Sequence, residues 1–264
     1  MWSLKDMFGP KSLRIVVKMG GNVVKEPAQV AAVAAELAAL RDLGHQVCVV
    51  HGGGPQLDAA LAELGETVEK VDGLRVTSLA AATVVEQVLD DLGQELTDAL
   101  ASHGLPARHL DVGERAFAGR VKNVRLGRVG TATGFAVAPD AWRGHLNVVT
   151  PVAYDASGPL NLNADEGAAA VAAWWKAHWL VLATDVSAVR GDAGESIAAL
   201  TPASAKALIG GAAKGGMIPK LQNAIDALAA GVGNVLITRL EPGVLLDAVA
   251  GKKVRGTLVA EATA

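Results

Sequence analysis

CVVHGGGPQ, residues 48–56, is an apolar run that ends in three glycines, and VVKMGGN, residues 16–22, has the same form. A glycine after a strand lets the chain turn without a Cβ penalty, and it lets backbone N–H groups come close to a ligand. Two such turns, each at the end of a predicted strand, indicate one anionic ligand held from two sides. Taken alone, either turn is also consistent with an ordinary strand-to-helix connection of an α/β protein.

Apolar runs of strand length alternate with helical patterns along most of the chain, which is typical of parallel βαβ units. The middle, residues 105–160, is rich in Gly, Val and Arg and predicts strands and hairpins. The predicted strands elsewhere are RIVVKM (14–19), QVCVV (46–50), LVLATDV (180–186), NVLIT (234–238) and GTLVA (256–260). The predicted helices are a segment from Pro27 to Gly44, PQLDAALAEL (55–64), 77–103, NADEGAAAVAAWWKAHW (163–179), TPASAKALI (201–209) with a Thr cap, MIPKLQNAIDALAAG (217–231) and PGVLLDAVAG (242–251).

The helix predicted over residues 77–103 is unusually long. One apolar stripe runs along it, broken only by Gly93, and consists of Val85, Leu89, Leu92, Leu96 and Leu100. A helix of this length usually packs against more than one sheet, so part of it is expected to face another subunit. The Trp174, Trp175 and Trp179 cluster is assigned to core or interface packing.

Composition excludes several classes of function. The 264 residues are 51% hydrophobic and include no apolar run long enough to span a bilayer, and residues 1–14 lack the apolar centre of a secretion signal, which predicts a cytoplasmic protein. A net charge of −3 and 3% aromatic residues argue against nucleic acid and favour a small-molecule ligand. The single cysteine, Cys48, excludes an internal disulfide and is predicted to be a small buried strand residue rather than a nucleophile.

Two polar stretches suggest a binding site. In GLRVT (73–77), Arg75 offers a planar fork suited to a carboxylate, although an isolated loop arginine is also a common solvated residue. In NLNADEGA (161–168), Asn161, Asn163 and Asp165 fall on one side if the segment is extended. Helix capping explains one of these three polar residues and leaves two unexplained.

A third stretch, GGAAKGGMIPK (210–220), opens a helix with glycines and two lysines. Lys220 falls in the first helical turn, where a cation opposes the helix dipole, so an anion is expected nearby unless the side chain simply reaches into solvent. The Walker pattern and the G-x-G-x-x-G fingerprint are both absent from the sequence, so P-loop and dinucleotide sites lose their main support.

Six motifs, in order, resemble the amino acid kinase family: VVKMGGN, VVHGGGPQ, GLRVT, NLNADEGA, ATDV and GGMIPK. The resemblance runs from Lys18 to Leu258. It implies an α/β fold, a three-layer α/β/α sandwich around a mostly parallel eight-stranded sheet, in a single domain over 1–264. In that fold residues 1–160 would form the half that binds an acyl amino acid, and residues 161–264 the half that binds MgATP.

The branch of the family with the most similar motifs phosphorylates the side-chain carboxylate of N-acetyl-L-glutamate, giving an acyl phosphate in arginine biosynthesis. The resemblance therefore implies a phosphotransferase with a carboxyl acceptor, ATP as phosphoryl donor, and Mg²⁺ that arrives with the nucleotide rather than in a cage of protein side chains. A carboxylate is already ionised at neutral pH, so no general base is required. Two alternatives stay open: a kinase for aminoadipate or glutamate attached to a carrier protein, and a non-catalytic amino-acid sensor on the same fold.

The resemblance also assigns residues. Lys18 and Lys220 would neutralise the transferring phosphoryl group and the leaving phosphate, and Asp165 would orient both lysines. The residues matched to substrate binding are Gly53, Gly54, Arg75 and Asn161. Those matched to phosphate and nucleotide binding are Gly20, Gly21, Asn163, Asp185 and Gly216. TDVSAVRG departs from the family pattern at Ser187 and Ala188, where a glycine is common, so the loop at Asp185 is expected to differ in shape.

The resemblance bears on assembly as well. Arginine-inhibited relatives carry an N-terminal helix of some twenty or more residues that interlaces dimers into a hexamer, whereas here only a short segment precedes RIVVKM. WSLKDMF (2–8) places Leu4, Met7 and Phe8 at helical spacing, and Gly9 and Pro10 end that pattern. We therefore predict a homodimer, paired through the stripe of the long helix, whose activity is insensitive to arginine.

Overall fold

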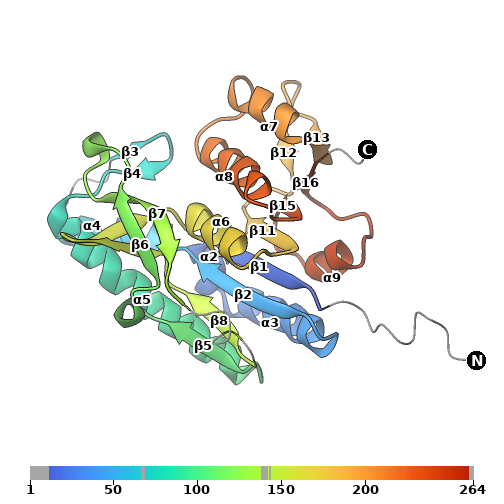
Figure 1. Ribbon diagram of the computed structural model, residues 1–264, viewed down its shortest axis with the longest axis horizontal. Helices are drawn as coiled ribbons and strands as arrows, with labels where there is room; N and C mark the ends of the chain where they lie inside the picture. Colours follow the sequence, from blue (N-terminus) through green and yellow to red (C-terminus); the bar gives the residue numbers. More distant parts are fainter. Residues whose placement is uncertain (1–11, 67–68, 138–141, 143, 262–264) are drawn as a thin grey trace, which may run out of the picture.

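A computed structural model describes residues 12–66, 69–137, 142 and 144–261, so the predicted N-terminal helical pattern lies outside the described residues. The centre of the molecule is an eight-stranded sheet (Figure 1). Its strands, in spatial order, are β14 (Ala199–Leu200), β16 (Thr257–Val259), β15 (Asn234–Thr238), β11 (Trp179–Ala183), β1 (Arg14–Met19), β2 (Gln46–His51), β8 (Leu146–Val149) and β5 (Ala107–Leu110). Only the β15–β16 pairing is antiparallel among these strands.

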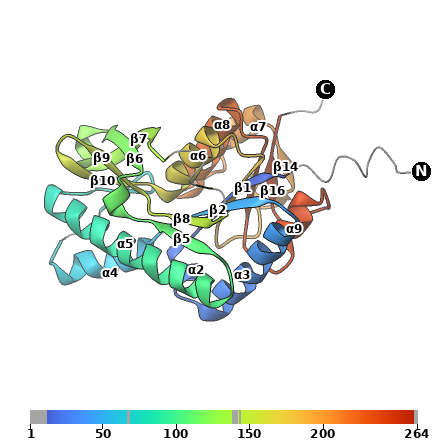
Figure 2. The same ribbon diagram turned by 60° about the horizontal axis from the view of Figure 1, so that its bottom comes forward.

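Helices cover both faces of this sheet. Figure 2 shows α3 and α5 on one side of β1, β2 and β8, and α6 and α8 on the other. The helices are α2 (Gly21–Val24), α3 (Pro27–Asp42), α4 (Gly54–Glu63), α5 (Leu79–Ser102), α6 (Ala164–Trp174), α7 (Pro202–Ile209), α8 (Met217–Ala229) and α9 (Val244–Val249), with short 3-10 turns η1 (Val112–Glu114) and η2 (Val124–Leu126). The three-layer α/β/α fold with a mostly parallel eight-stranded sheet is thus confirmed.

Alternation along β1 decides which side chains reach which layer. Ile15 and Val17 are buried against α3 and α9, whereas Val16 is buried in the core beneath α6 and α8. Lys18 shares the side of Val16, since side chains two apart in a strand point the same way. It stands opposite Val50 of β2 and Leu182 of β11. The central strand therefore delivers a lysine to the α6–α8 layer at its carboxyl end.

The predicted strands and hairpins of the middle segment form a second, smaller structure. Strands β6 (Phe117–Val121), β7 (Val129–Phe135), β9 (Val152–Asp155) and β10 (Gly158–Leu162) close into a four-stranded barrel. This barrel packs against α5 through β10 and against α6 through β7. Two short hairpins, β3 (Lys70–Val71) with β4 (Leu74–Arg75) and β12 (Val189–Arg190) with β13 (Ser196–Ile197), complete the strands.

One helix is shorter than predicted. The pattern indicated a helix over 163–179, but α6 ends at Trp174, Lys176 adopts a left-handed conformation with φ 51°, and Trp179 begins β11. Both α6 and β11 are buried, so the apolar run continues across the turn and hydrophobicity alone does not mark the boundary. Thr201 caps α7, with Pro202 in its first turn, as predicted.

The apolar stripe of α5 is buried within this chain. Val85, Leu89, Leu92, Leu96 and Leu100 are at most 3% exposed and pack on the sheet and on neighbouring helices. The prediction that this stripe is available for two-fold pairing is therefore wrong. The helix spans two layers, and the whole stripe is buried by packing within the chain. Among the described residues, no helix is both long and apolar enough to cross a membrane.

Aromatic side chains fill the corner between the barrel and α6. Trp142 stacks at centroid distances of 4.9 Å on Trp175 and 5.5 Å on Trp174, and Phe135 joins them at 5.7 Å from Trp142. Trp174 and Trp175 thus serve core packing, as expected, while Trp179 lies in β11 on the other side of the core. Cys48 is fully buried in β2, as predicted.

Candidate active site

A cleft of about 990 Å³ runs across the carboxyl ends of the parallel strands, where α/β sheets commonly bind ligands. Both glycine turns, the β3–β4 hairpin and the first turns of α6 and α8 contribute to its walls. All twelve residues predicted for the site line this cleft: Lys18, Gly20, Gly21, Gly53, Gly54, Arg75, Asn161, Asn163, Asp165, Asp185, Gly216 and Lys220. Residues from all six sequence motifs therefore meet in one place.

Asp165 bridges two lysines at the centre of the cleft. Its Oδ1 lies 3.1 Å from Lys18 Nζ, and its Oδ2 accepts a 2.9 Å hydrogen bond from Lys220 Nζ. Lys220 Nζ also donates to the Ala183 carbonyl, at 3.3 Å, at the end of β11. The carboxylate in the first turn of α6 thus joins the central strand to α8. It is also the anion that the unfavourable position of Lys220 at a helix N-terminus led us to expect.

The charges of this trio are coupled. Burial by itself would raise the pKa of Asp165, but the two ammonium groups and their hydrogen bonds outweigh burial and lower it to about 2. Burial lowers the pKa of Lys220, the charge of Lys18 adds to this effect, and Asp165 opposes it. A fixed anion therefore holds two cations together where bulk water is largely excluded.

The two glycine turns pack directly on each other. A Cβ on Gly21 would lie 2.9 Å from Gly53 Cα and 3.2 Å from the Gly52 carbonyl oxygen, so a side chain there would force the turns apart. Gln56 Nε2 donates to the Gly21 carbonyl at 3.0 Å, and Gly52 N donates to the Met19 carbonyl at 2.8 Å. The turns thus require glycine in part because they lie so close together. Together they form one part of the cleft wall beside Lys18.

Arg75 is held at the wall of the cleft, although it was expected in a loop. It ends β4, is 8% exposed, and pairs with Asp58 of α4 while Nη2 donates to the Gly54 carbonyl at 3.0 Å. Lys70 also pairs with Asp58, at 2.9 Å. Burial tends to raise the pKa of Asp58, but the hydrogen bonds from Arg75 and Lys70 lower it overall. The guanidinium is thereby fixed before any ligand arrives.

The segment NLNADEGA is not extended throughout, because β10 ends at Leu162 and α6 begins at Ala164. Asn163 is the helix cap, and its side-chain oxygen accepts from the backbone N–H groups of Asp165 and Glu166 at 3.0 and 3.1 Å. Asn161 donates from Nδ2 to Thr77 Oγ1 at 3.0 Å. The capping alternative thus explains Asn163, while Asn161 and Asp165 contact other elements of the site.

Sequence reasoning missed three cations of the cleft: Lys70, Lys214 and Arg239. Lys214 stands in the glycine-rich stretch before α8, which was singled out only for Lys220.

Arg239 follows β15, and its Nε donates to the Asp185 backbone carbonyl at 3.0 Å. The Asp185 side chain is exposed, and Thr184 Oγ1 donates to its Oδ1 at 3.1 Å. The signal in the sequence that could have identified Arg239 is its position directly after a predicted strand.

The cleft carries an excess of positive charge. Its described lining includes six cationic side chains, Lys18, Lys70, Arg75, Lys214, Lys220 and Arg239, against the two carboxylates Asp165 and Asp185. Such a cleft concentrates anions and stabilises negative charge that develops within it. Among the described residues, no group of three or more His, Cys, Asp or Glu side chains is placed to hold a metal ion.

Comparison with known proteins agrees with this architecture. The model of the amino acid kinase family matches residues 13–239. Acetylglutamate kinase of Psychrobacter arcticus is 34% identical over an alignment of 268 positions, and the alignment covers 93% of this chain and 88% of that protein. The structure of smu.665 from Streptococcus mutans UA159 superposes with a TM-score of 0.80 at 29% identity, covering 94% of this chain and 99% of that one.

A second solved structure shares the fold as part of a longer chain. N-acetylglutamate synthase from Neisseria gonorrhoeae superposes with a TM-score of 0.82 at 22% identity. The match covers 96% of the present chain but 60% of the synthase, which was solved with coenzyme A and N-acetyl-glutamate. At this level of identity the likeness concerns the fold alone.

Proposed function

Because the chain belongs to the amino acid kinase family, we propose that it transfers the γ-phosphoryl group of ATP to the side-chain carboxylate of N-acetyl-L-glutamate, in arginine biosynthesis. The observation that carries the proposal is the Lys18–Asp165–Lys220 bridge beside the joined glycine turns. A site for transferring a phosphoryl group between two anions needs fixed positive charge and backbone donors at one point. The choice of N-acetyl-L-glutamate as the acceptor rests on relatives that are named acetylglutamate kinase.

The reaction requires little from the protein beyond position and charge. A carboxylate oxygen attacks the γ-phosphorus, an O–P bond forms, and the bond from phosphorus to the β–γ bridging oxygen breaks to release ADP. The acceptor is already ionised at neutral pH, so no proton has to be removed. In this proposal Lys18 and Lys220 reduce the repulsion between the two anions and neutralise charge on the transferring oxygens. Asp165 keeps both ammonium groups at that point.

The acceptor is proposed to lie on the side of the cleft built by about residues 1–160, with Asn161 at its boundary. Arg75, fixed by Asp58 and Gly54, presents a planar fork to the substrate's α-carboxylate. Asn161 uses its N–H₂ on Thr77, which leaves its amide oxygen for the acetamido N–H of the substrate. The N–H groups of Gly53 and Gly54 are assigned to the reacting end of the acceptor.

The nucleotide is proposed to lie on the side built by residues 161–264. Asp185, Gly216 and the missed cations Lys214 and Arg239 line that side of the cleft. The N–H groups of Gly20 and Gly21 are assigned to the phosphates, together with Asn163 and the positive end of the α6 dipole. Magnesium usually binds through one or two carboxylates plus substrate phosphates, so the residues present fit Mg²⁺ that enters with ATP.

A direct assay tests this function. The purified chain is incubated with ATP, Mg²⁺ and N-acetylglutamate, and the acyl phosphate is trapped with hydroxylamine while ADP is measured in parallel. Free glutamate, free aspartate and carrier-linked aminoadipate serve as competing acceptors. We expect product with N-acetylglutamate and a much lower rate with the unacetylated amino acids, which would bring a charged ammonium into a cleft that already has an excess of positive charge.

The same assay, run beside a calorimetric measurement of N-acetylglutamate binding, separates the two alternatives. Product with carrier-linked aminoadipate alone would assign the chain to that branch and refute the free substrate. Binding of N-acetylglutamate without any ADP release would identify a sensor. The sensor alternative predicts loss of Lys18, Lys220 or Asp165, and all three are present and in mutual contact.

We further propose a cytoplasmic homodimer that is insensitive to arginine. Since the stripe of α5 is buried within the chain, the pairing surface has to lie on other residues. Light scattering at the mass of two chains, with an activity unchanged by millimolar arginine, is the expected result. A mass of six chains together with arginine inhibition would refute both parts.

A further inference from the structure

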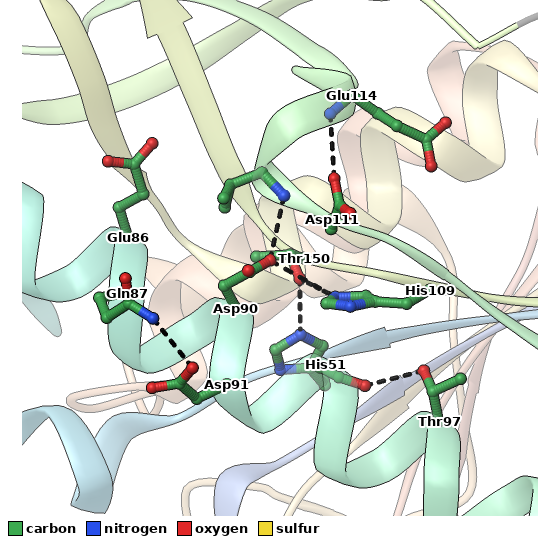
Figure 3. Close-up of polar contacts among 12 residues, drawn as sticks. His51, Glu86, Gln87, Asp90, Asp91, Thr97, His109, Asp111, Glu114 and Thr150 are labelled. Atoms are coloured by element: carbon green, nitrogen blue, oxygen red, sulfur yellow. Dashed lines mark hydrogen bonds and ion pairs between the residues drawn. The ribbon is translucent and has the colours of Figure 1, made fainter.

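A polar cluster lies behind the Gly52–Gly54 turn, outside the cleft. Figure 3 shows His51, His109 and Thr150 facing one another at the ends of the neighbouring strands β2, β5 and β8, beneath α5. Thr150 Oγ1 lies 3.2 Å from His51 Nε2 and 2.8 Å from His109 Nε2. His51 is fully buried and Thr150 is 3% exposed. Two imidazoles therefore share one buried hydroxyl.

Helix α5 is adapted to this cluster. Gly93, which breaks its apolar stripe, leaves the room: a Cβ there would lie 2.3 Å from His109 Nε2 and 2.7 Å from Thr150 Oγ1. Asp90, one turn earlier on the same face, accepts from the Val112 backbone N–H at 3.0 Å, and its Oδ1 lies 3.7 Å from His109 Nε2. A glycine inside a helix lowers helix stability, so its presence points to the close approach.

The donors in the cluster can be assigned. A threonine hydroxyl has one proton, so Thr150 donates to one imidazole and accepts from the other. The carboxylate of Asp90 favours the proton on His109 Nε2, which then donates to Thr150, and Thr150 donates to His51 Nε2. Burial lowers the pKa of both histidines, that of His51 to about 3, so both rings are neutral at physiological pH. His51 then carries its proton on Nδ1, next to the backbone of Gly52.

The cluster is joined to the glycine turn by the chain and by packing. His51 is the residue before Gly52, and Thr150 precedes Pro151, which lines the cleft. Leu89 and Leu92 of α5 press on the turn so closely that a Cβ on Gly53 would lie 2.9 and 2.7 Å from their methyl groups. The Thr150 hydroxyl therefore lies against α5 at Gly93 while it bonds to the two strand histidines, and α5 in turn packs on the Gly52–Gly54 backbone.

We propose that Thr150, acting through His51 and His109, is a positioning residue that holds the Gly52–Gly54 turn in place for phosphoryl transfer. This role rests on the proposed kinase function. Displacing a catalytic group by about 1 Å can slow a reaction 100-fold, so a small shift of this turn has a measurable effect.

The test compares Thr150→Val, which removes the hydroxyl at nearly constant shape, with Thr150→Ser, which keeps it. For Thr150→Val we expect kcat to fall about 10- to 100-fold with a smaller change in the KM for ATP, since the cluster lies behind the Gly52–Gly54 turn, which is assigned to the acceptor. Thr150→Ser should recover most of kcat. The matched control is Thr97→Val, which removes a buried hydroxyl that belongs to α5 and bonds within that helix, to the Gly93 carbonyl at 2.8 Å; this variant should leave kcat unchanged. Equal kcat in Thr150→Val and Thr97→Val would overturn the proposal.

A second measurement does not depend on kinase activity. Nitrogen-15 spectra of the histidine rings in the wild-type chain should show His109 protonated at Nε2 and His51 at Nδ1, both neutral at pH 7. Amide shifts of Gly52–Gly54 should change in Thr150→Val and stay in place in Thr97→Val. The reverse tautomers, or turn amides that do not respond to Thr150→Val, would refute the positioning role whichever acceptor the enzyme uses. If these shifts appear and the chain phosphorylates none of the acceptors, the kinase function fails and the structural link stands.

Discussion

Asp165→Asn is the substitution that most directly tests the bridge between the two lysines. The change keeps the shape of the side chain and removes its charge. In the wild type the carboxylate contacts Lys18 at 3.1 Å and Lys220 at 2.9 Å, and both lysine side chains are largely buried. The variant leaves two ammonium groups facing each other without a counter-ion. We expect losses of both stability and rate.

The stability loss can be estimated from the pKa of Asp165. A carboxyl group whose pKa falls from 3.8 to about 2 on folding contributes about 2 kcal/mol at neutral pH. Because the pKa is depressed, this contribution is fully present above the unfolded value and disappears as the pH falls through about 2. For a chain of this size about 2 kcal/mol corresponds to a Tm lower by roughly 4–8 °C. The difference from wild type should be constant between pH 5 and 8 and narrow below pH 4.

The expected loss of rate has a separate cause: without the carboxylate, the ammonium groups of Lys18 and Lys220 are no longer held in position. Removal of one preorganised charge-stabilising group typically lowers kcat by about 10²–10³, and here two groups lose their anchor. Calorimetry and steady-state kinetics on Asp165→Asn should be run beside Glu166→Gln. Glu166 is the next residue in the same helix turn and pairs with Lys122 at 2.5 Å, partly in solvent. Its neutralisation should therefore lower the free energy of unfolding by less than about 1 kcal/mol and leave kcat unchanged. If the two variants have the same Tm and the same kcat, the bridge has neither role.

Three further substitutions test other parts of the site and fold. Lys220→Ala should lower kcat by about 10²- to 10⁴-fold with a smaller effect on substrate affinity. A near-normal kcat in a fixed-time activity assay would show that Lys220 takes no part in the reaction. Arg75→Lys should weaken N-acetylglutamate binding in calorimetry while ATP binding is kept, since an ammonium cannot reproduce the planar fork; unchanged affinity would place the α-carboxylate elsewhere. Glu36→Gln should lower the free energy of unfolding by about 1–3 kcal/mol, because the buried carboxylate accepts from Gly243 and Leu245 N–H groups, each at 2.8 Å, and an amide would present a donor to one of them. Chemical denaturation measures this change, and an unaltered midpoint would contradict the role of Glu36.

The layered fold could be predicted because its local signals agree with its tertiary structure. β1 and β2 alternate or run apolar as buried parallel strands do, and Thr201 with Pro202 starts α7 where the sequence predicts a cap. The exceptions have a common cause. Where a buried helix leads directly into a buried strand, as at Trp174 to Trp179, composition is the same on both sides, and only the left-handed Lys176 separates them.

The motif residues predicted for the site line the cleft, whereas the isolated cations of the cleft were not predicted. Asp165 and Lys220 stand in unusual local patterns, and the family resemblance gave them their predicted roles. Lys70 and Arg239 have no such pattern, and they reach the cleft only because the β3–β4 hairpin and the end of β15 are brought there by the fold. The link between Gly93 and Thr150 is equally invisible in the sequence, since it depends on the distance between a helix and strands far along the chain.

The position of β1 has a consequence for synthesis of the chain. β1 pairs with β2 on one side soon after both are made, but its other edge pairs with β11, which begins only at Trp179. About 130 residues separate the end of β2 from that strand, which at 5–20 residues per second takes roughly 6–26 s on the ribosome. During this interval the central strand of the future sheet presents an unpaired apolar edge. Every nascent copy therefore passes through a stage at which it can pair with another unfinished chain, and an arrest of translation before Trp179 would hold it there.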